Sequence, residues 1–518
     1  MKLRLALLVS AASGFVALSY EILWYRLYSF VTQGAPLAFG VLLGFYLIGI
    51  AVGSYGSRRY CEGHDVRDRA ATLSALGRFL FLANLVGFLV APSLAWMVTV
   101  APWGASLVVV VLATSLLGAV LPLASHLAIP ADDHAGARLS YLYIANILGS
   151  SAGSLLTGFV AMDRYSTRQI AVGLGLLGLG LAAAVLLAGE RRGPRAWVSL
   201  AAVVAAAGVI GLSSHAIFDQ LYERLLYRKD FTPETHFAET VENRSGLIHV
   251  SEDGRVWGGG IYDGAFNVSI AADRNWIVRA FAVSALHPRP RRMLMIGLAS
   301  GSWGKVLAAA PGLEHFTIVE INPGYLGLIA RHPEVAGILA DPKVEIVIDD
   351  GRRWLLSHPD ESFDAIVMNT TWHWRAHSTN LLSLDFFELV KKHLHPGGLF
   401  YFNTTSSLDA CKTVIAAFPH TYRVINFVAG SDAPLFIDRG QWKEVLESYR
   451  IDGQPVLDLS TEAGRETEQR LLDFSVPGTS DHGLGDEAEM RARCAAGEVI
   501  TDDNMLPEWR ELVHWVEP

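Results

Sequence analysis

Cysteine is scarce in this chain of 518 residues, which contains only Cys61, Cys411 and Cys494. The three lie far apart and none belongs to a CxxC pair, so their spacing predicts neither a disulfide framework nor a zinc site. No other set of metal ligands is recognisable. Histidines near Asp349 and Asp350 leave only a weak alternative, and we expect no metal.

Charge is scarce as well, at 18% of residues, and the net charge of −9 is carried mostly by the second half of the chain. No basic stripe is visible, so nucleic acid is not an expected partner. Apolar residues make up 51% of the sequence, and the mean hydropathy of +0.31 is too high for an ordinary soluble enzyme. The excess lies before residue 219 and predicts a membrane half followed by a soluble half.

Seven apolar blocks in the first half are each long enough to span a bilayer. They lie at 3–30, 37–56, 79–100, 107–129, 139–162, 170–189 and 197–217. The first block could pass for a signal peptide, but no clear cleavage site follows it and further spans do. We therefore expect an α-helical multi-span membrane domain at 1–218, with its first helix retained.

Two features interrupt these apolar blocks. Glu21 and Arg26 lie in the first block, where a charge at membrane depth costs roughly 2.5 to 3.5 kcal/mol on insertion scales. Arg26 is near the end and can snorkel. Glu21 fits a buried ion pair, a contact with a substrate or lipid headgroup, or an interfacial position.

Gly149 and Gly153 in the fifth block form a GxxxG pair, which predicts close helix packing.

Two short segments precede the main soluble fold. Residues 219–237 predict an amphipathic linker that lies on the membrane surface. Residues 238–290 predict a small β-rich part, because short apolar runs alternate with turn residues, followed by a helix at 273–286.

The rest of the soluble half divides into two parts. Residues 291–440 alternate strand and helix patterns, as in an α/β Rossmann-like domain of the methyltransferase type. Residues 441–518 are polar and irregular, and we expect a C-terminal extension. Its acidic turn, Asp502, Asp503 and Asn504, is either the edge of a lid or simply exposed.

The strongest motif begins with the apolar run 293–296. This run ends at Gly297, and Gly301 follows before a helix-like segment, so the layout is strand, tight turn and helix. Glycines allow a ligand to approach the backbone, and the start of the helix offers unpaired N–H groups. A second run ends at Glu320, roughly 20 residues further on, where a carboxylate can accept from both hydroxyls of a ribose.

A third run, 344–348, ends at Asp349 and Asp350, where a side chain can accept from an adenine amino group. The glycine turn does not match GxGxxG, because Ala299 and Ser302 interrupt it, which argues against a dinucleotide and its pyrophosphate. S-adenosylmethionine or a relative fits better, since it has a ribose and an adenine but no phosphate.

The loop after the strand 363–368 is the expected catalytic loop, because ligands of open α/β sheets bind beyond the carboxyl ends of the strands. It contains Asn369, His373 and His377 among further aromatic and basic residues. A single histidine is more often a surface or packing residue. A cluster beside a nucleoside site favours catalysis.

The motifs over roughly 262–405 resemble the spermidine synthase (polyamine aminopropyltransferase) family, in particular its membrane-fused bacterial branch. GLASGS stands where the family has a GGGDG turn, VEIN resembles its VEID, DDGRRWL resembles its DG motif, and IYDGAFN resembles its segment that ends on the nucleoside. The resemblance implies S-adenosylmethionine or its decarboxylated form as co-substrate. The implied nucleoside-binding residues are Asn267, Gly297, Gly301, Glu320, Asp350 and Gly351.

The positions that carry the family's chemistry differ here. Ser300 stands where the family has an aspartate that recognises the donor's amino group, and Asn369 stands where an aspartate takes a proton from the attacking amine. Ile277, Val278 and Arg279 replace the family's Tyr-His-Glu element. An amide cannot accept that proton, and the lost anionic groups remove the attraction for a polycation. Spermidine formation is therefore doubtful.

Three functions remain open. The first is a membrane-anchored transferase that passes an aminopropyl or alkyl group to a small-molecule or lipid-like acceptor, with His373 or His377 as base and Asn369 positioning the acceptor. The second is spermidine synthase proper, acting on putrescine. The third is a non-catalytic nucleoside- or amine-binding transporter or sensor. A homo-oligomer is possible in each case.

Two arguments about the side of the membrane disagree. Arginine-rich loops at 58–69 and 191–195 belong in the cytoplasm, and seven crossings then leave the soluble half outside. S-adenosylmethionine, however, is supplied in the cytoplasm. We give the nucleoside chemistry more weight, since one block could be re-entrant or cross twice. We expect a multi-pass protein of the cell inner membrane with a cytoplasmic soluble domain.

Overall fold

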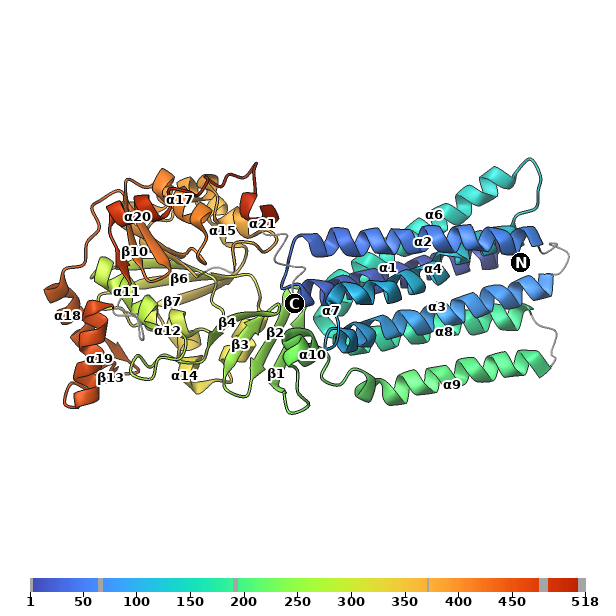
Figure 1. Ribbon diagram of the computed structural model, residues 1–518, viewed down its shortest axis with the longest axis horizontal. Helices are drawn as coiled ribbons and strands as arrows, with labels where there is room; N and C mark the ends of the chain where they lie inside the picture. The colour runs from blue at the N-terminus through green and yellow to red at the C-terminus, as the bar shows by residue number, and fades with distance from the viewer. Residues whose placement is uncertain (1–2, 64–68, 190–193, 370–371, 475–482, 511–518) are drawn as a thin grey trace. The chain divides into compact units, whose positions relative to one another are not determined.

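The computed structural model describes residues 3–63, 69–189, 194–369, 372–474 and 483–510. They form two compact units, shown in Figure 1. The first unit holds the described chain up to Phe237 together with Glu242–Arg244, and the second unit holds Ala238–Val241 and the described chain from Ser245 onward.

The first unit is a bundle of long apolar helices, and the prediction of about seven spans is confirmed. Within the described residues, seven helical segments are long and apolar enough to cross a membrane, as in a multi-pass membrane protein. The segments are α1 (Leu3–Val31), α2 (Leu37–Gly63), α3 (Arg69–Met97), η1 with α4 and α5 (Trp103–Ser106, Leu107–Gly118, Val120–Ala128), α6 with η2 and α7 (Ala135–Leu156, Thr157–Ala161, Met162–Arg164), α8 (Thr167–Gly189) and α9 (Pro194–Ile217).

The GxxxG pair is a packing contact, as predicted. A side chain at Gly149 would collide with the backbone of Ala11, and one at Gly153 would collide with the backbone of Phe15. The absence of a side chain therefore lets α6 approach α1 closely.

The segment after the spans folds against the bundle. It contains α10 (Leu221–Tyr227) and η3 (Arg228–Asp230). Tyr222 and Leu225 are buried, and the Tyr222 ring lies 5.5 Å from the ring of Phe30 in α1. The predicted position on a membrane surface stays a prediction.

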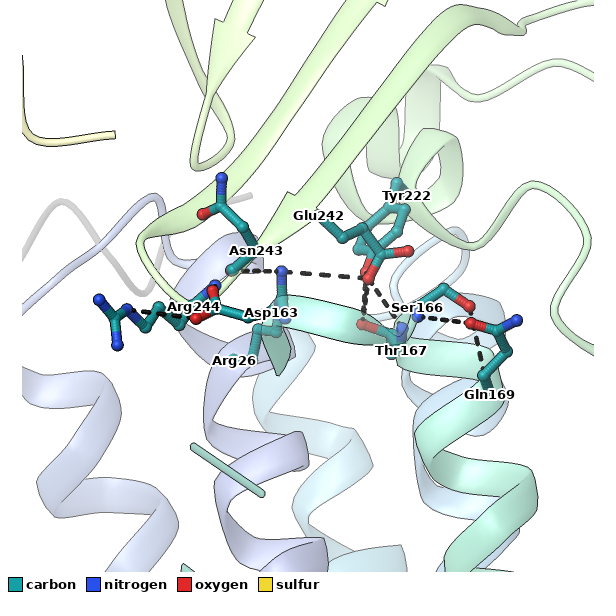
Figure 2. A network of polar contacts seen from close by, with 9 residues as sticks. All are labelled: Arg26, Asp163, Ser166, Thr167, Gln169, Tyr222, Glu242, Asn243 and Arg244. Carbon is teal, nitrogen blue, oxygen red and sulfur yellow. Dashed lines mark hydrogen bonds and ion pairs between the residues drawn. The ribbon is translucent and has the colours of Figure 1, made fainter. Parts of the chain in front are cut away.

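Arg26 contacts residues at the end of strand β1 (Phe237–Asn243), as Figure 2 shows. Its Nη2 donates to the carbonyl oxygen of Asn243 at 3.0 Å and lies 4.0 Å from Oε2 of Glu242. The same carboxylate oxygen accepts from the Thr167 hydroxyl at 2.7 Å and from the Tyr222 hydroxyl at 2.9 Å. Arg26 is thus held by a polar network within the first unit.

Glu21 takes no part in that network. Among the described residues, no cationic group lies within 4.0 Å of its carboxylate, and its side chain is partly exposed. The predicted alternative of a buried ion pair is therefore not found for Glu21. Its other two alternatives stay predictions.

The second unit begins with a small sheet in the order β1-β2-β3-β4. β2 pairs with β3, and β3 with β4, in antiparallel fashion, as expected from the turn-rich sequence. The strands are β1 (Phe237–Asn243), β2 (Gly246–Ser251), β3 (Arg255–Gly258) and β4 (Ile261–Ala265).

A mixed sheet in the order β14-β10-β11-β9-β8-β5-β6-β7 follows. The pairs among β5 to β9 are parallel, and the pairs at the β14 edge are antiparallel. The strands are β5 (Arg292–Ile296), β6 (His315–Glu320), β7 (Val344–Ile348), β8 (Phe363–Met368), β9 (Leu394–Asn403), β10 (His420–Val424), β11 (Phe427–Ser431) and β14 (Leu484–Gly485), with a separate pair β12 (Arg450–Ile451) and β13 (Gln454–Pro455). The α/β fold predicted from sequence is confirmed.

The register brings the carboxyl ends of the parallel strands to one edge. Ile296 pairs with Val319 on one side and with Met368 on the other, and Glu320 pairs with Ile348. The chain reverses its winding direction at β5, which lies between β8 and β6. Open α/β sheets bind ligands at such a reversal.

Helices flank the sheet of the second unit. They are α11 (Val278–Leu286), α12 (Ser302–Ala308), α13 (Gly324–Ile329), α14 (Pro333–Ala336), η4 (Gly337–Ala340), α15 (Gly351–Ser357), η5 (Ser378–Leu381), α16 (Leu384–Lys392), α17 (Leu408–Ala417), α18 (Arg439–Ser448), α19 (Glu462–Asp473), α20 (Glu487–Arg493) and α21 (Leu506–Arg510). α11 begins later than predicted, because Asp273 accepts from the backbone N–H of Ile277 at 2.9 Å and Trp276 has a positive φ of 58°.

Two expectations about the C-terminal part were wrong. The segment expected to be irregular contains α18 and α19, whose buried faces pack through Trp442 and Leu471. Cys411 and Cys494, whose spacing predicted no disulfide framework, form a disulfide with a Cα–Cα distance of 5.8 Å. The fold joins them although 83 residues separate them in sequence.

Candidate functional site

A cavity of about 750 Å³ lies in the second unit at the carboxyl edge of the sheet. Its walls come from β3 and β4, the start of α11 with the segment before it, the glycine turn after β5 with the start of α12, and the loop after β8. The end of β9, β10 and the turn between β10 and β11 complete them. Among the described residues, two of the nine predicted site residues line it, namely Gly297 and Asn369.

The glycine turn has the geometry that its sequence suggests. Gly297 and Gly301 have positive φ angles of 89° and 79°, a conformation that other residues rarely adopt. A side chain at Gly301 would press against Ile329 at 2.9 Å. Leu298 and Ala299 of this turn line the cavity.

The carboxylate of Glu320 fixes this turn through hydrogen bonds. Its Oε2 accepts from the backbone N–H of Leu298 at 2.7 Å and of Ala299 at 3.3 Å, and its Oε1 accepts from Asn322 at 2.7 Å. Burial raises the pKa of this carboxyl, and the three N–H donors oppose the shift. Glu320 is 4% exposed and does not line the cavity. A ribose would have to share oxygens that already fix the turn.

Asp350 and Gly351 lie at the start of α15. Oδ1 of Asp350 accepts from the backbone N–H of Arg353 at 2.9 Å, which caps the helix. A side chain at Gly351 would meet Ile296 of β5 at 2.5 Å, so glycine is needed for the helix to approach the strand. Neither residue lines the cavity.

Asn267 serves its own loop. It is 5% exposed, donates from Nδ2 to the carbonyl oxygen of Ala272 at 2.7 Å, and accepts on Oδ1 from the N–H of Ser269 at 2.8 Å. Its amide is therefore occupied by backbone groups, and it does not line the cavity.

Asn369 is the last member of a chain of amides. Arg279 donates from Nη1 to Oδ1 of Asn426 at 3.0 Å, Asn426 donates from Nδ2 to Oδ1 of Asn403 at 3.0 Å, and Asn403 donates from Nδ2 to Oδ1 of Asn369 at 3.3 Å. All four residues line the cavity.

The two candidate histidines differ in environment. His373 is 7% exposed, and its Nδ1 lies 2.7 Å from Oγ1 of Thr405, a cavity-lining residue. The Thr405 hydroxyl also donates to the carbonyl oxygen of Thr404 at 2.8 Å. His373 itself does not line the cavity. His377 is exposed and immediately precedes η5, with a φ of 67°.

The acidic turn of the C-terminal segment lies away from the cavity. Asp502 forms a bidentate ion pair with Arg352 and accepts from the Ser383 hydroxyl at 2.7 Å. The C-terminal segment reaches the cavity through Gly483 and Arg493 instead.

Sequence reasoning missed most of the cavity wall. Arg279 was noticed only as a replacement, and Asn403 and Asn426 were not considered. They lie on the β9 and β11 side of the sheet, and only the antiparallel pairing of Asn403 with Phe427 brings them together. A polar residue directly after a buried strand was the one available signal.

Comparison with known proteins identifies the domain. Residues 280–422 match the family model described as spermine/spermidine synthase domain. The polyamine aminopropyltransferase of Desulforudis audaxviator is 30% identical over 141 residues, which are 26% of this chain and 50% of that protein. The match thus spans half the length of that relative.

A second relative matches over a longer region. Polyamine aminopropyltransferase 2 of Ralstonia nicotianae is 24% identical over 425 residues, 78% of this chain and 78% of that protein. A match of this length extends into the helical half. A solved structure of spermidine synthase in complex with the transition state analogue AdoDATO is 16% identical with a TM-score of 0.35, and covers 46% of this chain and 84% of that chain. The second unit thus contains a domain that matches the spermine/spermidine synthase family model, and the chain is similar to polyamine aminopropyltransferases.

Proposed function

We propose that this chain is a membrane-embedded transferase that binds a sulfonium nucleoside, S-adenosylmethionine or its decarboxylated form, and passes an aminopropyl or alkyl group to a small-molecule or lipid-like acceptor. The observation that carries the proposal is the glycine turn between Gly297 and Gly301, braced by Glu320, beside the 750 Å³ cavity. The aminopropyltransferase domain supports it.

The reaction needs little covalent help from the protein. A nucleophile on the acceptor attacks the carbon next to the sulfonium, the new bond forms as the carbon–sulfur bond breaks, and the sulfur leaves as a neutral thioether. The protein must align the two partners and exclude water. In the proposal, the turn orients the donor and the Asn369 loop orients the acceptor.

An amine acceptor must lose a proton, and the amide of Asn369 cannot take it. In the proposal His373 takes that proton, because its Nδ1 lies 2.7 Å from the hydroxyl of Thr405, which lines the cavity. The exposed position of His377 gives it less support.

We place the soluble domain on the cytoplasmic side of the inner membrane, because its donor is available there. One set of observations favours a second function. Seven helical segments, the arginine-rich loops and the Cys411–Cys494 disulfide together fit a domain on the outer, oxidising side. There the domain would be a nucleoside- or amine-binding sensor or transporter component without chemistry.

The test uses the full-length protein in lipid nanodiscs. Calorimetric titration with S-adenosylmethionine, its decarboxylated form and methylthioadenosine should show saturable binding, and binding of none of them would overturn the proposal. Asp350→Ala removes the carboxylate that the family resemblance assigns to the adenine amino group, and in the proposal it should abolish binding. Asp438→Ala is the matched control, because it removes an equivalent helix cap from α18, where Asp438 accepts from the N–H of Gln441 at 2.9 Å.

Turnover then separates the functions. Product from putrescine would identify spermidine synthase proper, whereas product only with added lipid extract would identify a lipid-like acceptor. Binding without product under any condition would identify the binding protein. His373→Ala should keep binding and lose turnover, and His358→Ala, at the far end of α15, should keep both.

A further inference from the structure

The cavity is lined by far more cationic than anionic side chains. Among the described residues, five arginines and a single carboxylate form its charged wall. They are Arg255, Arg274, Arg279, Arg423, Arg493 and Asp263. Arg255 pairs with Asp253, and Arg423 and Arg493 pair with Glu489. The remaining arginines, Arg274 and Arg279, give the wall a positive excess that disfavours a polyamine.

The guanidinium of Arg279 is fixed in the cavity wall by hydrogen bonds. Its guanidinium donates to the carbonyl oxygens of Trp276 and Asn275 and to the amide of Asn426, at 2.9, 3.0 and 3.0 Å. Every partner is neutral. Burial lowers the pKa of this group, yet an arginine stays charged. The guanidinium is partly exposed at the cavity wall, and among the described residues no carboxylate lies within 4.0 Å of it. A bound anion could therefore pair with it directly.

The chain of amides makes Asn369 a hydrogen-bond donor, which also favours an anionic ligand. Arginine can only donate, so Asn426 must present its oxygen to Arg279 and its NH2 group to Asn403. Asn403 then presents its NH2 group to the oxygen of Asn369. Asn369 is left with its own NH2 group as the donor. The chain thus ends in an N–H donor where an aminopropyltransferase of the usual kind has a carboxylate.

The single carboxylate in the wall already has partners within the protein. Asp263 accepts a hydrogen bond from the Tyr325 hydroxyl and lies near the charge of Arg375. Burial raises the pKa of Asp263, and these two partners oppose the shift. Arg274 and Arg279 have no carboxylate within 4.0 Å among the described residues.

We infer that this cavity binds a ligand that carries a carboxylate, held by Arg279 and the NH2 group of Asn369. The inference rests on the proposed function for the identity of the donor. Arginine and amide donors match a carboxylate in geometry and charge. The carboxylate belongs either to the donor, which is then S-adenosylmethionine itself and not its decarboxylated form, or to an amino-acid-like acceptor.

Pairs of ligands that differ by one carboxylate test the inference. Full-length protein in nanodiscs is titrated with S-adenosylmethionine against its decarboxylated form, and with ornithine against putrescine. We expect the carboxylated member of one pair to bind at least tenfold more tightly. We call this difference in affinity within a pair the carboxylate gap. A gap in the first pair assigns the carboxylate to the donor, and a gap in the second pair assigns it to the acceptor. Equal binding within both pairs, or preference for the decarboxylated members, overturns the inference.

Variants locate the carboxylate. Arg279→Gln keeps a donor toward Asn426 and removes the charge, and it should shrink the gap to less than threefold. Arg279→Lys should retain part of it. The control Arg491→Gln removes an exposed charge from α20 without touching the cavity, and it should leave the gap unchanged. An unchanged gap in Arg279→Gln contradicts the assignment to Arg279, even if the unmodified protein shows the preference.

Methylthioadenosine separates this inference from the proposed function. It lacks the donor's aminoalkyl chain and the carboxylate on that chain. Its binding therefore reports the nucleoside site alone. Binding of methylthioadenosine without a carboxylate gap contradicts only the inference. A gap in the ornithine pair without nucleoside binding contradicts only the proposed function.

Discussion

The carboxylate of Glu320 accepts the backbone N–H of Leu298 at 2.7 Å, so the end of one strand fixes the turn that follows its neighbour. A hydrogen bond to a charged group contributes about 1.5 to 3 kcal/mol. This relationship makes the shape of the turn depend on a residue 22 positions away.

Glu320→Gln should therefore weaken methylthioadenosine binding by roughly tenfold to a hundredfold, since the amide loses one of two acceptor oxygens. Calorimetry on the full-length protein measures the loss. Glu345→Gln is the control, because Glu345 is an exposed residue of β7 whose side chain faces His315 at 3.8 Å. Equal effects of the two variants would show that Glu320 has no special role in the turn.

The amide chain gives a second prediction. Asn403→Asp replaces a donor by a group that only accepts, so Asn369 must turn its NH2 group toward residue 403. The preference for carboxylated ligands should then fall from at least tenfold to about none. Asn380→Asp adds the same charge at an exposed site in η5 and should leave the preference intact. Retention of the preference in Asn403→Asp would contradict the chain of donors.

The parallel strands were predictable because buried strands are continuous apolar runs that end at polar or glycine residues. The runs that end at Gly297, Glu320 and Asn369 gave both the strands and the edge where the site lies. α18 was predictable and was missed. Its buried residues Trp442, Val445 and Leu446 have helical spacing, but the surrounding polar residues masked the pattern.

The disulfide and the cationic wall could not be derived from sequence in the same way. Cys411 and Cys494 are brought together by the packing of α17 and α20, which no local pattern encodes. Likewise Arg279 comes from α11, Asn403 from β9 and Asn426 from the turn before β11, and their contacts depend on the register between β9 and β11. The positions of such residues depend on how distant segments pair in the fold. A glycine turn, in contrast, can be recognised from a single short motif.

The ion pair between Asp502 and Arg352 predicts a pH dependence. The Arg352 guanidinium, with the Ser383 hydroxyl, lowers the pKa of Asp502 below its ordinary value of 3.8 against the opposing effect of partial burial. A lowered pKa means that the stabilising contribution is present above pH 3.8 and is lost as the pH falls through the lowered pKa. Because the pair is partly exposed, its contribution is at most about 1 kcal/mol.

Asp502→Asn should therefore lower the thermal unfolding midpoint of the full-length protein at pH 7, and variant and parent should converge as the pH drops toward 3. Fluorescence-detected unfolding in nanodiscs measures both. Asp503→Asn, which changes the neighbouring residue without the Arg352 contact, is the control. A difference that persists unchanged at pH 3 would show that the ion pair is not its source.

The redox state of Cys411 and Cys494 distinguishes the two candidate functions. Disulfides are rare in the cytoplasm and persist outside it, so the proposed transferase on the cytoplasmic side should carry both cysteines as thiols in the living cell. The measurement traps thiols by rapid acid quenching of cells, followed by alkylation and mass determination. Cys61, a free cysteine of α2, serves as the internal standard for complete alkylation. Thiols at 411 and 494 support the transferase, whereas a pair already oxidised before lysis places the domain outside, removes its supply of sulfonium donor, and favours the binding protein.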